Sequence, residues 1–82
     1  MSDFAQDLAA YALKAPEGFP LYAPAPELVL IADDLKSGVK PLSIIAIRAR
    51  TMSDGVDNEM IAARLRCIFK RIQRHGVSEV AA

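Results

Sequence analysis

The segment from Asn58 to His75, NEMIAARLRCIFKRIQRH, decides the fold because it combines an apolar stripe with a cluster of basic residues. Its large aliphatic residues are spaced by four, three and four positions: Ile61, Leu65, Ile68 and Ile72. At about 100° per residue they share one face of a helix. We therefore predict a helix over 58–75 whose aliphatic stripe is buried in the core, with a homodimer interface as the alternative for the same stripe.

Both ends of this helix have sequence signals. Asp57 is the expected N-cap, and Glu59 places an acidic side chain in the positively polarised first turn. Arg74 and His75 fall in the last turn, where the helix dipole favours basic side chains. Gly76 fits the C′ position at which many helices end, so we expect the helix to stop there.

The basic residues of this segment fall on the half of the helix opposite the stripe, with no acidic residue among them after Glu59. A solvated helix face usually mixes both signs of charge and gains ion pairs. A face of one sign indicates an anionic partner, because guanidinium groups hold carboxylate or phosphate through paired hydrogen bonds. The simpler interpretation is a face that only provides solubility. Together with two upstream arginines, the candidate partner-binding residues are Arg48, Arg50, Arg64, Arg66, Lys70, Arg71 and Arg74.

Charge is balanced over the chain but unevenly distributed along it. Ten basic and ten acidic residues give a net charge of zero. Residues 1–40 carry three basic and six acidic residues, a net −3, whereas residues 41–82 carry seven and four, a net +3. Without an overall positive field, non-specific binding to nucleic acid should be weak. The uneven distribution suits contact with one acidic surface, or pairing with a second copy of the chain.

The N-terminal part predicts one helix and an irregular connector. Phe4, Leu8 and Tyr11 recur at helical spacing within residues 2–15. Prolines and a glycine then interrupt regular structure over residues 16–26. Because this proline-rich segment also contains bulky apolar side chains that need burial, we expect an ordered connector rather than a flexible linker.

Two further helices are expected in the middle of the chain. Pro26 suits the first position of a helix over 26–37, and Gly38 suits its end. A third helix is expected over 42–52. The predicted fold class is therefore all-α, a compact bundle of about four helices in a single small domain over residues 1–82.

The alternative is an α+β fold. The apolar run 28–31 and the β-branched run 43–47 could each form a buried strand, because periodicity alone does not assign such short runs. The two would then pair as a short hairpin over residues 28–50.

Residues 26–50 also raise the question of a helix-turn-helix motif, since two expected helices flank a short turn that contains glycine. The expected recognition helix, LSIIAIRAR over 42–50, has apolar residues where polar side chains should read base edges: Leu42, Ile44, Ile45 and Ile47. If DNA is the partner, we expect Arg48, Arg50 and the cationic face of the last helix to contact phosphates. A small DNA-binding transcriptional regulator is therefore the alternative function.

No pattern in the sequence supports catalysis, a metal site or a cofactor. Cys67 lacks a nearby base, because His75 is two helical turns away on another side. His75 has no metal ligand four residues before or after it that shares its helix, and adjacent Asp33 and Asp34 diverge on a helix. A single cysteine excludes an internal disulfide, although Cys67 could form one between two copies.

The sequence therefore predicts a non-enzymatic protein. It has no apolar run long enough for a membrane span and no secretory pattern, which favours a cytoplasmic location without membrane contact. In overall profile it is similar in kind to the small regulators and inhibitors carried by phages and mobile elements. The leading hypothesis is a small binding or regulatory protein that docks an arginine-rich helix on an acidic protein or nucleic-acid-handling protein and inhibits it.

Overall fold

The computed structural model describes residues 3–15, 18 and 23–81, with side chains as far as residue 76. These residues form four α-helices and no strand. The helices are α1 (Asp3–Leu13), α2 (Pro26–Ser37), α3 (Leu42–Gly55) and α4 (Glu59–Ala81). The predicted all-α bundle of about four helices is confirmed. The hairpin alternative is wrong, because α2 and α3 occupy the residues that would have formed it.

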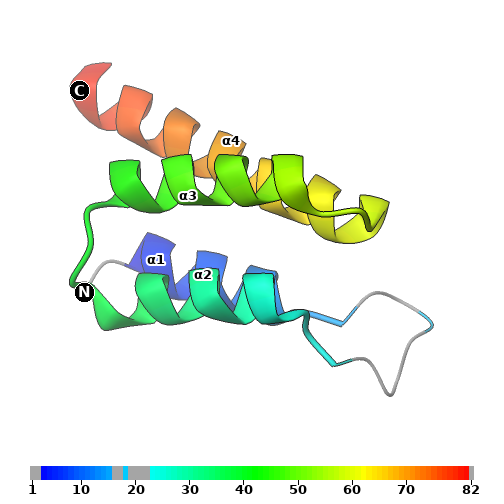
Figure 1. Ribbon diagram of the computed structural model, residues 1–82. Helices are drawn as coiled ribbons and strands as arrows, with labels where there is room; N and C mark the ends of the chain where they lie inside the picture. The colour runs from blue at the N-terminus through cyan, green and yellow to red at the C-terminus, as the bar shows by residue number, and fades with distance from the viewer. Residues whose placement is uncertain (1–2, 16–17, 19–22, 82) are drawn as a thin grey trace.

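The helices run alternately in opposite directions along a body of 40 × 24 × 21 Å (Figure 1). In that view α1 and α2 form one layer and α3 and α4 the other; α1 packs chiefly on α2, and α3 chiefly on α4. The expected ordered connector falls largely on residues outside the described ranges, namely 16–17 and 19–22.

Local signals account for the boundaries of α2. Pro26 stands at its start, where a missing N–H costs no helical hydrogen bond. Gly38 ends it with a φ of 68°, a left-handed conformation that a side chain would disfavour. Both features agree with the sequence-based prediction.

Helix α3 extends three residues beyond the predicted end at Met52 and finishes at Gly55. The extension places Ser53 on the buried side, where only 4% of its surface is exposed. Its hydroxyl donates a hydrogen bond of 2.6 Å to the carbonyl oxygen of Arg50, so the buried polar group is satisfied within the helix. Pro41 precedes the helix as its N-cap.

Helix α4 differs from the prediction at both ends. Its N-cap is Asn58, not Asp57, because the Asn58 side-chain oxygen accepts hydrogen bonds from the backbone N–H groups of Met60 and Ile61 at 2.9 and 3.2 Å. At the other end Gly76 does not stop the helix, which continues to Ala81. Gly76 does not adopt a positive φ, and no proline follows to block helical hydrogen bonding.

The aliphatic stripe of α4 lies in the core as expected. Leu65 and Ile68 have no exposed surface, Ile72 is 4% exposed, and Ile61 is half-buried against the same cluster. All four helices contribute to this cluster, including Leu8 of α1. The stripe therefore packs against other helices of the same chain. This packing fixes which side of α4 faces outward.

Candidate functional site

The outward side of α4 carries a row of three cations, Arg66, Lys70 and Arg74, which we call the outer row. Successive members are four residues apart, or about 6 Å along the helix axis. All three side chains are exposed. In the described part of the chain none of them makes an ion pair or hydrogen bond. The outer row is therefore a charged surface without an internal counter-ion there.

Arg64 belongs to the same helix but is used inside the molecule. Its Nη1 donates hydrogen bonds to the carbonyl oxygens of Tyr11, at 3.4 Å, and Lys14. Its guanidinium carbon lies 5.2 Å from the centre of the Tyr11 ring. Helix α1 has no basic residue in its last turn, so Arg64 supplies the positive charge that this helix end favours. Its role here is to join α4 to α1.

Arg71 also turns towards α1 but stays exposed. Its guanidinium carbon is 3.9 Å from the centre of the Tyr11 ring, a close cation–π contact. Its N–H groups make no hydrogen bond to another described residue. Arg71 is therefore held in place with its donors still available.

Tyr11 interacts with both arginines and with Cys67. Burial raises the pKa of the Tyr11 phenol above its ordinary value of 10.0. A hydrogen bond and a charge interaction with the Cys67 side chain raise the pKa further, against the opposing effects of Arg71 and Arg64. Cys67 itself is an exposed free thiol. The disulfide between two copies remains a prediction.

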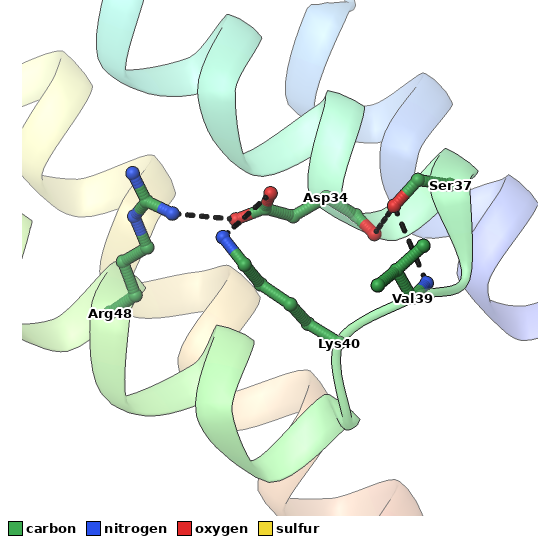
Figure 2. A network of polar contacts seen from close by, with 5 residues as sticks. All are labelled: Asp34, Ser37, Val39, Lys40 and Arg48. Atoms are coloured by element: carbon green, nitrogen blue, oxygen red, sulfur yellow. Dashed lines mark hydrogen bonds and ion pairs between the residues drawn. The ribbon is translucent and has the colours of Figure 1, made fainter.

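The two arginines of α3 point to different neighbours. Arg48 makes an ion pair with Asp34 of α2 at 3.0 Å, and Lys40 pairs with the other carboxylate oxygen at 3.2 Å (Figure 2). The Ser37 hydroxyl beside them donates to the backbone oxygen of Asp34 at 3.1 Å. The acidic half of the chain thus neutralises Arg48.

Arg50 is exposed on the other side of α3. Its guanidinium carbon lies 5.4 Å from the centre of the Phe69 ring of α4. The structure therefore does not gather all seven predicted residues on one face. It places three in the outer row, leaves Arg71 and Arg50 exposed at the flanks of α4, and uses Arg64 and Arg48 in contacts between helices.

An open hollow of about 280 Å³ lies where the start of α1 meets α4, lined by Phe4, Arg71, Arg74 and His75. The Phe4 and His75 rings are stacked, with centres 3.9 Å apart and planes 5° from parallel. The sequence indicated neither residue as part of a site. Phe4 showed only the spacing of a core residue, and no local signal pairs residues from opposite ends of a chain.

Other classes of site find no support in the described ranges. No three or more His, Cys, Asp or Glu side chains there are grouped to hold a metal ion. None of the helices searched there combines the length and apolar character that a membrane crossing requires.

Comparison with known proteins does not indicate a function for this chain. No protein-family model matches the chain, and no curated protein or solved structure matches it at a significant level. The functional conclusion therefore depends on the side chains described above.

Proposed function

We propose that this chain is a small, non-enzymatic binding protein that docks the outer row of α4 on an acidic protein surface and so inhibits or antagonises its partner. The observation that carries the proposal is the exposure of Arg66, Lys70 and Arg74 without an ion pair in the described structure. Within this proposal the protein acts in the cytoplasm, as small regulators of phages and mobile elements do.

The electrostatics of the free protein supports a docking role. Arg66 and Lys70 are four residues apart, as are Lys70 and Arg74, so both neighbouring pairs have like charge. Such pairs destabilise a helix by about 0.2–0.5 kcal/mol each. An acidic surface laid against the row converts this repulsion into attraction. The row is therefore costly in the free protein and favourable in a complex.

A protein partner is favoured over nucleic acid for two reasons. The net charge of zero gives no long-range attraction to a polyanion. The exposed side of α3 presents Ile44 and Ile47, which are 50% and 60% exposed and offer no donor or acceptor to base edges. A DNA-binding regulator would therefore depend on phosphate contacts alone.

A pull-down with the tagged chain tests the proposal. We expect one protein to be recovered in stoichiometric amount, with an acidic surface at the contact, and we expect Lys70→Glu to abolish recovery. Lys36→Glu is the matched control, because Lys36 is exposed on α2 and the change in charge is the same. Equal recovery with both variants would refute docking through the outer row.

A gel-shift assay at low salt tests the alternative function. We expect no shift of duplex DNA at protein concentrations that saturate the protein partner. A shift that weakens steeply with salt, and weakens again in Lys70→Gln, would instead indicate a DNA-binding regulator.

Self-association is tested by measuring the molecular mass in solution with and without reductant. A dimer that reductant dissociates, and that Cys67→Ser removes, would support the predicted disulfide between two copies. A monomer under oxidising conditions would refute it.

A further inference from the structure

We infer that the hollow lined by Phe4, Arg71, Arg74 and His75 is a carboxylate-binding subsite, which receives an aspartate or glutamate side chain of a protein partner. The inference rests on the proposed function and names the group that the partner contributes. It concerns the edge of the cationic surface next to α1, whereas the outer row runs along the outward side of α4.

Arg71 is the preorganised donor of this subsite. Its guanidinium carbon lies 3.9 Å from the centre of the Tyr11 ring, and this contact restrains the guanidinium group. An ordinary exposed arginine loses side-chain entropy when it binds a ligand, whereas a stacked one has already lost part of it. Its N–H groups make no hydrogen bond within the described residues and are suited to the two oxygens of a carboxylate.

Arg74 supplies a second guanidinium three residues later, on the same side of α4. It is also the last member of the outer row, so the subsite and the row are continuous. A partner segment that places one acidic side chain in the hollow can therefore place others along Lys70 and Arg66.

The stacked rings form the apolar wall of the hollow. Phe4 and His75 lie parallel at 3.9 Å and present a flat surface beside the two guanidinium groups. Such a wall can cover the methylene groups of an incoming glutamate or aspartate.

A carboxylate is favoured over a phosphate group because the net charge of zero gives the chain no long-range attraction to a polyanion. Asp7 lies three residues after Phe4 and four before Tyr11, so it falls on the side of α1 that carries these two residues. It makes no ion pair with Arg71 or Arg74 in the described structure. Its negative charge repels a phosphate dianion more than a singly charged carboxylate.

The test uses the only histidine in the chain as a reporter. Capped hexaglutamate is titrated into the protein while the ring-proton NMR signals of His75 and Phe4 are followed. We expect both sets of signals to shift together with the backbone amides of Arg66 and Lys70. Arg71→Gln should weaken binding by about tenfold, the loss of one charge-assisted contact. Asp7→Asn should strengthen it, because a negative charge that repels the peptide is removed.

Arg71→Lys separates geometry from charge. It retains the positive charge and loses the planar pair of donors, so binding should weaken nearly as much as in Arg71→Gln. If Arg71→Lys binds the peptide as well as the parent protein does, the preorganised geometry of the subsite is refuted.

The outcomes distinguish the subsite from the proposed function. Shifts of Arg66 and Lys70 without shifts of the His75 and Phe4 rings would refute the subsite and leave docking through the outer row intact. No shift at any of these positions would refute both. A parallel titration compares acetate with inorganic phosphate, and stronger perturbation of His75 by phosphate would overturn the carboxylate assignment.

Discussion

Two groups of cations on α4 make different contacts although their members are interspersed along one helix. Arg64 and Arg71 turn to α1, where both lie over Tyr11 and Arg64 bonds to backbone carbonyl oxygens. Arg66, Lys70 and Arg74 are exposed and have no ion pair among the described residues. The comparison shows that counting the arginines on a helix overestimates the number available to a partner. A neighbouring helix can use the donors of some of them, as α1 uses those of Arg64.

The α2–α3 contact also uses an arginine inside the molecule, but the group that it contacts is different. There an arginine is occupied by a carboxylate, since Arg48 pairs with Asp34 at 3.0 Å. Between α1 and α4 the arginines meet an aromatic ring and backbone oxygens instead. In both places the helices are joined at a partly exposed edge beside the apolar core.

The largest expected effect comes from detaching α4 from the core, which would abolish the distinction between its inward and outward cations. Leu65→Ala removes a side chain with no exposed surface and should lower the free energy of unfolding by about 2–5 kcal/mol. Met60→Ala on the same helix is the control, because Met60 is 55% exposed and should change stability far less. Urea unfolding followed by circular dichroism measures both, and similar losses would contradict the assigned faces.

The next effect tests the two groups of cations directly. Arg64→Ala should cost about 1–2 kcal/mol, because it removes charge-assisted hydrogen bonds at a half-buried position. Arg66→Ala should change stability by less than about 0.5 kcal/mol, since Arg66 is exposed without an ion pair there. The same unfolding experiment compares the two variants. If the two losses are equal, Arg64 has no distinct structural role.

A smaller effect concerns the helix beyond the outer row. Gly76 is helical, and a Cβ atom added there would meet nothing within 4 Å. Gly76→Ala should therefore raise the free energy of unfolding by about 0.5–1 kcal/mol. If Gly76 instead ended the helix with a positive φ, the same substitution would lower the stability of the protein. The sign of the measured difference thus decides between a continuous α4 and one that stops near Arg74.

The smallest effect is a pH dependence at the α1–α4 contact. The folded state raises the pKa of Tyr11 above 10.0, chiefly through burial, so the folded state binds this proton more tightly than the unfolded state does. The resulting contribution to stability is complete below pH 10.0 and is lost as the pH rises through the folded-state pKa. Tyr11→Phe keeps the ring that the arginines contact and removes the titrating hydroxyl.

The difference in melting temperature between parent and Tyr11→Phe, measured at pH 8 and at alkaline pH, isolates this contribution from the lysines that titrate in both proteins. Above pH 10.0 the parent should lose more stability than the variant. Parallel curves would show that burial of the phenol has no energetic consequence.

Much of the fold could be predicted because its signals are local. The spacing of Ile61, Leu65 and Ile68 required only neighbouring turns of one helix, and Gly38 ended α2 through its own backbone conformation. Where local signals competed, the prediction was wrong. Asn58 replaced Asp57 as the N-cap of α4, and Gly76 remained helical. In each case neighbouring residues offered alternative ways to hydrogen-bond the backbone groups at the helix end.

The sequence by itself determined four amphipathic helices, the buried stripe of α4 and the presence of a cationic opposite side, because side-chain periodicity is a property of each helix alone. Only the tertiary structure decided which cations stay available. Arg64 donates to the carbonyl oxygen of Tyr11 across 53 residues of chain, whereas Arg71 contacts the Tyr11 ring across 60 residues and keeps its N–H donors available. Phe4 meets His75 from the opposite end of the chain. Such contacts depend on how the helices pack, since packing brings together residues that share no local pattern.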